Sequence, residues 1–175
     1  VPSARTLVEI EDTRGTEMTI KITGYQWKWH YDYLGEGVSF FSSLAADSNA
    51  ARRLGSGIDP ATVDHYLLNV DRPLVVPVGV KIRYLITSND VLHAWWMPDF
   101  AIKKDAIPGF INEGWFLVKE AGTYRGQCAE LCGKDHGFMP IVVEALPRED
   151  FDAWLAEQKA MAAAGREPAA RVASR

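Results

Sequence analysis

The most informative segment of this chain is Cys128-Ala-Glu-Leu-Cys132-Gly-Lys-Asp-His136-Gly-Phe-Met139, which is followed at once by Pro140. It contains both cysteines of the chain, together with a histidine and a methionine. Thiolate and thioether sulfur favour copper, imidazole also accepts it, and a thioether is a poor ligand for zinc, calcium or magnesium. The segment therefore predicts a copper site, and a copper site indicates electron transfer.

Two other interpretations of the segment remain open. The offsets of four, four and three between its sulfur and imidazole side chains would line one face of an α-helix, as core packing does. Gly133, Gly137 and Pro140 are poor helix residues, however, and favour an irregular loop whose groups converge on one point. Alternatively, Cys128 and Cys132 form a disulfide or redox pair, which leaves the histidine and the methionine as bystanders.

A further candidate ligand, His93, lies upstream in Ser88-Asn-Asp-Val-Leu-His93-Ala-Trp-Trp-Met-Pro98. It follows the β-branched and aromatic run 80–87, which reads as a strand, and loops at strand ends commonly pre-position metal ligands. One cysteine, two histidines and a weak methionine describe a site with a single copper. A second thiolate is present here, and two thiolates can bridge two metal ions with one imidazole for each. The sequence therefore favours a dinuclear copper centre, with Met139 and a backbone carbonyl as weaker ligands.

Strand-like runs recur between turn signals along most of the chain. Residues 5–11 lead through Asp12-Thr-Arg-Gly15 into residues 18–33, which predicts an early hairpin. Many short strands with Gly and Pro between them, and no helix alternating with them, predict an all-β sandwich or barrel. The further strands are expected at 66–70, 74–78, 80–87, 114–119, 122–127 and 140–145.

Other segments depart from the strand pattern. Residues 42–57 are small, polar and poor in strand formers, which favours an exposed loop. Apolar residues from Phe151 onward recur at helical spacing, so an amphipathic helix is expected from Arg148 to about Ala163. The predicted organisation is one domain over residues 1–146, the helix within 147–164, and a flexible tail over 165–175.

Composition and charge fit a single folded domain. The chain has 175 residues, 47% of them hydrophobic, and no window approaches the length of uncharged apolar sequence that a membrane span needs. Its first residues are not those of a signal peptide. A net charge of −4 favours a basic electron donor, and no nucleic-acid partner is expected. Asp90, beside His93, is a candidate docking residue, and Asp47, Asp59 and Asp64 are further candidates.

The chain resembles the CuA domain of cytochrome c oxidase subunit II. The matching segments are the one from Cys128 to Pro140, Asp90-Val-Leu-His93-Ala-Trp95, Asp105-Ala-Ile-Pro-Gly109 and Gly24-Tyr-Gln-Trp27-Lys-Trp29-His-Tyr31. They follow the family's order over most of the chain, and the copper loop is highly specific. The resemblance implies a cupredoxin-like Greek-key β-sandwich.

The resemblance also implies a role for each site residue. The two cysteines would bridge two coppers; His93 and Met139 would complete one, and His136 with the main-chain carbonyl of Glu130 would complete the other. The Glu130 carboxylate would bind magnesium at the boundary with subunit I, which supplies the remaining ligands. Trp27 would be the residue through which electrons enter from cytochrome c.

For the whole chain, the resemblance implies an electron-transfer domain that passes electrons from cytochrome c to the haem of subunit I and does not itself reduce oxygen. Complete family members carry two membrane helices ahead of this domain, so we expect a soluble fragment of a membrane-anchored protein from the periplasmic face of a bacterial inner membrane. The alternatives are the CuA domain of a nitrous-oxide-reductase-like enzyme and a copper-binding chaperone. The segment 105–109 favours the oxidase over the first, and the β-rich pattern favours it over the second.

Overall fold

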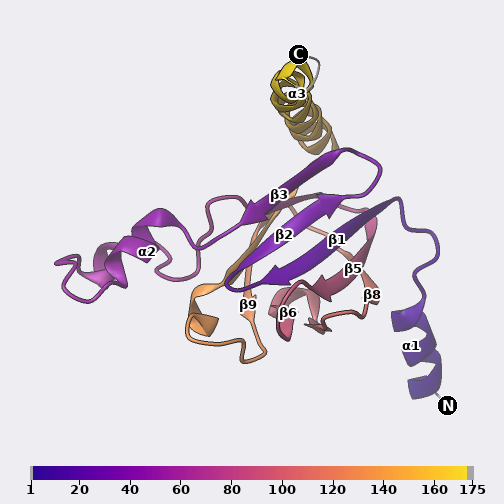
Figure 1. Ribbon diagram of the computed structural model, residues 1–175. Helices are drawn as coiled ribbons and strands as arrows, with labels where there is room; N and C mark the ends of the chain where they lie inside the picture. Colours follow the sequence, from indigo (N-terminus) through magenta and orange to yellow (C-terminus); the bar gives the residue numbers. More distant parts are fainter. Residues whose placement is uncertain (1, 173–175) are drawn as a thin grey trace.

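The computed structural model describes the backbone of residues 2–172 and the side chains up to residue 164. Two five-stranded sheets pack on a shared core (Figure 1), with strand orders β3-β2-β1-β5-β8 and β4-β10-β9-β6-β7. This arrangement confirms the predicted all-β sandwich. The strands are β1 (Met18–Tyr25), β2 (Lys28–Tyr33), β3 (Val38–Ser42), β4 (Leu74–Pro77), β5 (Lys81–Ser88), β6 (His93–Met97), β7 (Ile102–Ala106), β8 (Asn112–Leu117), β9 (Gly122–Cys128) and β10 (Pro140–Leu146).

The chain crosses repeatedly from one sheet to the other. After β1, β2 and β3 it enters the second sheet at β4, returns to the first at β5, and alternates again before β9 and β10. Two neighbouring pairs, β1 with β5 and β4 with β10, are therefore parallel, whereas the other paired strands are antiparallel. Such crossings are typical of Greek-key sandwiches.

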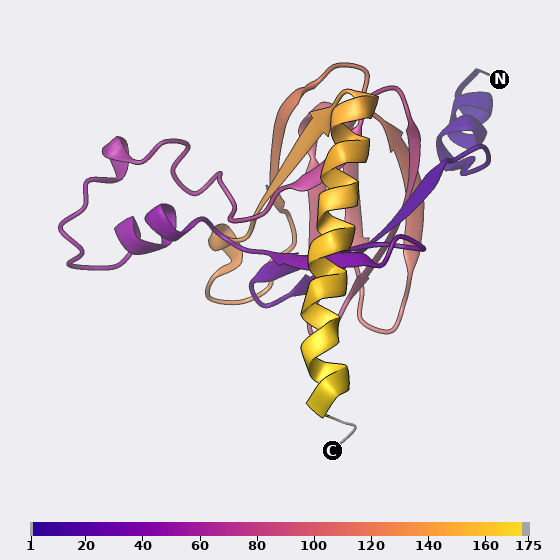
Figure 2. The same cartoon turned by 90° about the horizontal axis from the view of Figure 1, so that it is seen from above.

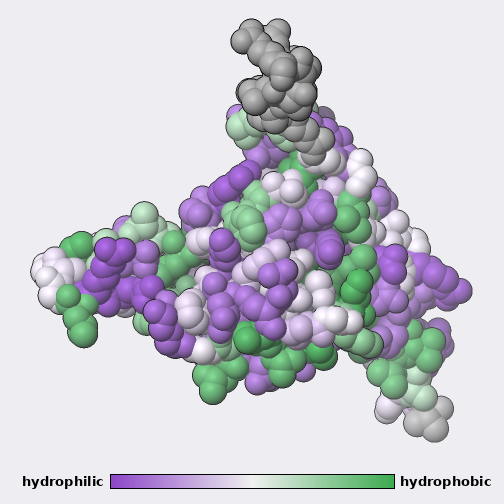
Figure 3. All heavy atoms as spheres, viewed as in Figure 1, coloured by the Kyte–Doolittle hydropathy of each residue, from purple (hydrophilic) through white to green (hydrophobic). Residues whose placement is uncertain are grey.

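The alternation of side chains along the strands builds the core. In β5, Ile82, Tyr84 and Ile86 are buried while the residues between them are partly exposed, and β2 alternates in the same way. Trp29 and Tyr31 of β2 are fully buried between the sheets. The outer face of β1 and β2 is largely hydrophilic (Figure 3), so this sheet has one buried and one solvated face.

Helices contact two edges of the sandwich. Helix α3 (Arg148–Val172) packs on β3 and β4, and Figure 2 shows it lying across that edge. Phe151 is 3% exposed, and the Trp154 ring lies 5.4 Å from that of Tyr33. Helix α1 (Pro2–Glu11) contacts β8 at another edge. No helix within residues 2–172 is both long enough and apolar enough to cross a membrane.

The predicted early hairpin was partly wrong. Residues 5–11 belong to helix α1 and not to a strand, and the hairpin lies wholly within 18–33 as β1 and β2. The reason is that β1 is already paired on both sides, by β2 and by β5, which leaves it no free edge for a further strand. The apolar side chains of α1 are exposed, Leu7 and Val8 among them.

Other expected boundaries also change. Residues 66–70 form no strand beyond an isolated bridge from Val70 to Leu44, and the expected loop at 42–57 contains helix α2 (Ala46–Ala51). Strands β3, β6 and β7 were not predicted. Helix α3 continues to Val172, past its predicted end. The last residues of the predicted tail, 173–175, lie outside the described part of the chain.

Candidate metal centre

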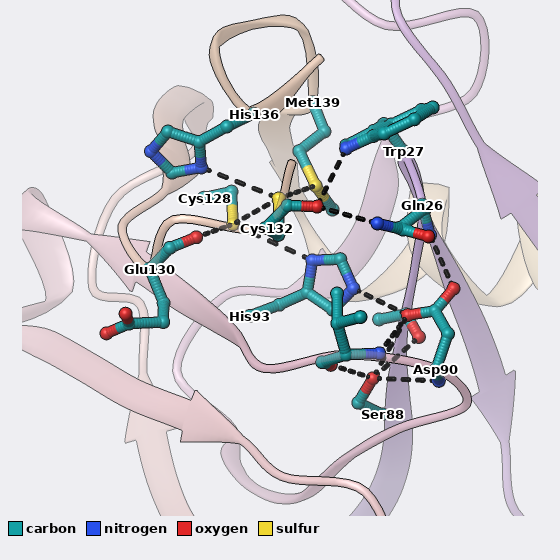
Figure 4. Close-up of polar contacts among 12 residues, drawn as sticks. Gln26, Trp27, Ser88, Asp90, His93, Cys128, Glu130, Cys132, His136 and Met139 are labelled. Atoms are coloured by element: carbon teal, nitrogen blue, oxygen red, sulfur yellow. Dashed lines mark hydrogen bonds and ion pairs between the residues drawn. The ribbon is translucent and has the colours of Figure 1, made fainter. Parts of the chain in front are cut away.

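Three connections meet at one end of the sandwich (Figure 4): the β1–β2 turn, the β5–β6 loop and the β9–β10 loop. His93 is the first residue of β6 and Cys128 is the last of β9, and these two strands are paired neighbours. The β9–β10 loop then brings Cys132, His136 and Met139 back over them. It contains only one helical turn, the 3₁₀ turn η3 (His136–Phe138), so the interpretation as a helix face does not hold.

The structure brings together the donor atoms of all six predicted copper ligands. The two cysteine Sγ atoms lie 3.9 Å apart, too far for a disulfide, and both thiols are free. His93 Nδ1 lies 3.9 Å from Cys128 Sγ, and His136 Nδ1 lies 3.5 Å from Cys132 Sγ. Met139 Sδ is 3.6 Å from Cys132 Sγ, which places two imidazoles and a thioether around the sulfur pair.

Glu130 presents its backbone and its side chain to different places. Its carbonyl oxygen lies 3.4 Å from Cys128 Sγ, whereas its carboxylate points away from the sulfur atoms (Figure 4). The main-chain oxygen is thus available at the sulfur pair. Glu130 is partly exposed, so its carboxylate is accessible to a partner other than the copper-ligand residues.

The pKa values of the two thiols are shifted in opposite directions. Burial opposes ionisation of Cys128, but hydrogen bonds, above all with His93, outweigh it and lower the pKa of this thiol. Burial and the neighbouring Cys128 raise the pKa of Cys132 to about 12. Two thiolates this close repel each other unless a cation lies between them, and a bound metal deprotonates its thiol ligands. The pair is therefore suited to a metal, and His93, Cys128 and Cys132 place their ligand atoms within 4.8 Å of one another.

The His93 imidazole is held from its far side by Asp90. Asp90 Oδ1 lies 2.9 Å from His93 Nε2, and the carboxylate accepts hydrogen bonds from the backbone N–H groups of Gln26 and Val91, both at 2.7 Å. A carboxylate in this position fixes the imidazole tautomer and leaves Nδ1 for a metal. This role of Asp90 was missed in the sequence, although its position three residues before His93 was a signal for it.

The aromatic motif near the start of the chain packs directly on the β9–β10 loop, residues 129–139, here called the metal-ligand loop. The backbone carbonyl of Cys132 accepts hydrogen bonds from Trp27 Nε1 at 3.1 Å and from Gln26 Nε2 at 2.8 Å. Trp27 is partly exposed, whereas Trp29 is fully buried with its ring 5.9 Å from that of His93. Gln26 was not predicted as a site residue, although it lies inside the quoted aromatic motif, next to Trp27.

The remaining acidic candidates belong to none of these three connections. Asp47, Asp59 and Asp64 are exposed on the segment between β3 and β4. Asp59 caps the 3₁₀ turn η1 (Pro60–Thr62) through the Ala61 N–H. A docking role for any of them stays a prediction.

The donor set fits copper. Two thiols, a thioether and two imidazoles are soft or intermediate ligands, and the four described side-chain contacts all involve sulfur. Four of the predicted ligands, His93, Cys128, Cys132 and Met139, are buried at this end of the sandwich, which suits a centre that changes its charge but not its geometry.

Comparison with known proteins agrees with this chemistry. A family model described as "Cytochrome C oxidase subunit II, periplasmic domain" matches residues 18–146. The probable cytochrome c oxidase subunit 2 of Rickettsia felis is 43% identical over 169 residues, which cover 96% of this chain and 50% of that protein. Cytochrome c oxidase subunit 2 of Myxine glutinosa is 39% identical over 155 residues, 89% of this chain and 64% of that protein. The chain thus spans about half the length of the Rickettsia relative.

Solved structures give the same result. The periplasmic domain of subunit II of cytochrome oxidase from Bradyrhizobium japonicum is 40% identical, with a TM-score of 0.74 over 86% of this chain and 99% of that one. A mixed-disulfide intermediate between a thioredoxin-like protein and subunit II of cytochrome c oxidase gives 40% identity and a TM-score of 0.68, covering 86% of this chain and 96% of that one. The fold, the cysteine–histidine cluster and these matches together place the chain in the cytochrome c oxidase subunit II family, as its periplasmic domain.

Proposed function

We propose that this domain accepts electrons from cytochrome c at a dinuclear copper centre and passes them to the haem of subunit I of a cytochrome c oxidase. One observation carries the proposal: the sulfur pair of Cys128 and Cys132 lies between two imidazoles, a thioether and a main-chain carbonyl. Family membership adds the physiological context.

The ligands divide naturally into a shared pair and two ends. Cys128 and Cys132 would hold both coppers through their sulfurs, with His93 and Met139 as the further ligands of one copper and His136 with the Glu130 carbonyl as those of the other. When bound, the copper pair supplies a one-electron couple whose charge is spread over both metals and both sulfurs. The protein contributes rigidity, because Asp90 and the backbone N–H groups behind it hold His93 before and after the electron arrives.

Trp27 is the proposed point of electron entry. Its indole is partly exposed, and its Nε1 donates to the carbonyl of Cys132, the same residue whose sulfur lies in the pair. A donor that docks over the indole therefore reaches the sulfur through one hydrogen bond and a few covalent bonds. The net charge of −4 favours a basic donor such as cytochrome c, with Asp90 as a candidate contact, so its electron-transfer rate should fall as ionic strength rises.

The rest of the oxidase supplies what this chain does not. We propose that the Glu130 carboxylate, which points away from the sulfur pair, binds magnesium together with residues of subunit I. The domain would lie on the periplasmic face of the inner membrane, anchored through helices that precede it in complete family members. Oxygen reduction would belong to the haem–copper site of subunit I.

Electron paramagnetic resonance and metal analysis of the copper-loaded domain test the proposal. Two coppers per chain that share one unpaired electron are expected, and Cys128→Ser or Cys132→Ser should abolish that signal. Met139→Leu should shift it mildly, and Met97→Leu is the matched control because Met97 is equally buried but lies in the core of β6. A single localised copper signal, or zinc alone, would refute the dinuclear assignment.

A further inference from the structure

The segment 43–71, here called the lobe, projects from the sandwich between β3 and β4 and carries α2 (Figures 1 and 2). Its two ends are tied together: Ser43 N–H donates to Asp71 Oδ1 at 2.7 Å, and Asp71 N–H donates to the Ser43 carbonyl at 2.9 Å. Inside it, the fully buried Ser48 accepts a hydrogen bond from the Leu67 N–H. The lobe is therefore an internally bonded unit.

Arg52, at the C-terminal end of α2, joins the lobe to the metal-ligand loop. Its Nη1 and Nη2 lie 3.1 and 3.5 Å from the two carboxylate oxygens of Asp135, and its Cζ lies 4.1 Å from the centre of the Phe138 ring. Its Nε donates to Asn49 Oδ1 within the lobe at 2.8 Å. The Arg52 and Asp135 side chains are only 25% and 21% exposed. A guanidinium engaged on its edge and on its face in this way has no equivalent in lysine.

His136 lies between the two residues that Arg52 contacts. Asp135 precedes it, and the Phe138 N–H closes the η3 turn on the Asp135 carbonyl at 2.9 Å. The His136 imidazole faces Cys132, and among the described residues it has no other hydrogen-bond partner. His93, by contrast, is oriented by Asp90. A ligand imidazole without such a partner depends on its backbone for its direction.

We propose that Arg52 is a positioning residue for His136. By fixing Asp135 and Phe138 on either side, it holds the turn that points the imidazole at the sulfur pair. This inference rests on the proposed function, in which His136 is a copper ligand. The lobe then acts as a brace for one end of the metal centre, and its sequence position in a polar, strand-poor segment gave no sign of that role.

Amide hydrogen exchange in the metal-free protein is the first test, because it does not depend on copper. Arg52→Ala should speed exchange at the Phe138 amide on the order of tenfold, since the turn loses a charge-assisted contact and a stacking contact. Arg53→Ala is the matched control, because Arg53 is the adjacent, exposed arginine and its side chain makes none of the described contacts. Exchange in the core strand β1 should be unchanged in both variants. Equal rates at Phe138 in Arg52→Ala and Arg53→Ala would overturn the proposal.

Paramagnetic NMR of the copper-loaded protein is the second test. In Arg52→Ala the shifted ring signals of His136 should move or broaden while those of His93 keep their positions, and Arg52→Lys should resemble Arg52→Ala. Equal changes at both histidines would mean a general loosening and would also overturn the proposal. If the unmodified protein binds no copper pair, the proposed function fails, while the exchange experiment still decides whether Arg52 braces the turn.

Discussion

Gly24→Ala should disturb the candidate metal centre by displacing the His93 ring. Gly24 lies on β1 with its Cα against the His93 ring, and an added Cβ would stand 2.7 Å from Cδ2 and 3.0 Å from Cγ of that ring. The ring must retreat by about 0.7 Å to restore ordinary contact. It has little room, because it is fully buried and held by Asp90 on one side and by the Trp29 ring on another.

The expected cost follows from these contacts. Forcing a carbon into a packed core costs about 1–3 kcal/mol, and a weakened Asp90–His93 hydrogen bond adds about 1 kcal/mol. Replacing a strand glycine by alanine returns about 0.5–1 kcal/mol. We therefore expect the free energy of unfolding to fall by about 2 kcal/mol, which for a chain of this size lowers the melting temperature by about 4–8 °C.

Thermal and urea unfolding of the metal-free protein measure this effect. Gly137→Ala is the matched control: it lies in the metal-ligand loop, but an added Cβ meets no atom within 4 Å, so its stability should stay within about 0.5 kcal/mol of the unmodified protein. After copper loading, Gly24→Ala should also alter the His93 signals. A Gly24→Ala protein as stable as the Gly137→Ala protein would show that the His93 ring is not fixed as described.

Three further predictions concern Asp90, Phe151 and Tyr84. Asp90→Asn weakens the hydrogen bond that orients the His93 imidazole and should lower copper affinity roughly 10–100-fold in chelator competition. Unchanged affinity would show that Asp90 does not orient His93 for copper binding. Phe151→Ala should reduce the free energy of unfolding in urea by about 3–5 kcal/mol, and a loss below about 1 kcal/mol would mean that α3 does not pack on the sandwich in solution. Burial, and then the charge of Glu11, raise the pKa of Tyr84 to about 12, above the 10.0 of a free tyrosine. Because the unfolded chain ionises first, this stabilising contribution is present below pH 10 and is lost as pH rises toward 12, and Tyr84→Phe should flatten that decline in alkaline unfolding curves.

Much of the candidate metal centre could be proposed from the sequence because its predicted ligands are close in sequence. Four of the five predicted side-chain ligands fall within residues 128–139, and the fifth, His93, could be found because it lies in the segment that follows the predicted strand 80–87. The supporting contacts between residues far apart in sequence were not predictable. Arg52 and Asp135 are separated by 83 residues, and Gln26 and Cys132 by 106, so only the folded sheets bring them together.

The strands that were missed lack the pattern that identifies strands. Strand β6 is buried at four of its five positions, with no alternation, because it lies between β7 and β9 inside the sandwich. Strand β7 has polar residues at its three central positions, as an edge strand permits. The wrong strand at residues 5–11 has a different cause: whether a segment joins a sheet depends on a free edge, and sequence pattern carries no information about that.

The two hydrogen bonds that converge on the Cys132 carbonyl have a consequence for how variants at the electron entry point should be interpreted. Trp27 supports the loop through one of these hydrogen bonds and is also the proposed conduit, so its removal would change both at once. Trp27→Phe keeps an aromatic ring but loses the N–H donor and part of the ring surface, whereas Gln26→Ala loosens the same carbonyl and leaves the indole in place. The defect in Gln26→Ala measures the support alone, and any additional loss in Trp27→Phe or Trp27→Ala measures the proposed conduit. A protein adapting to a new electron donor would accordingly have to vary the surface around the indole, because the indole itself belongs to the frame of the metal site.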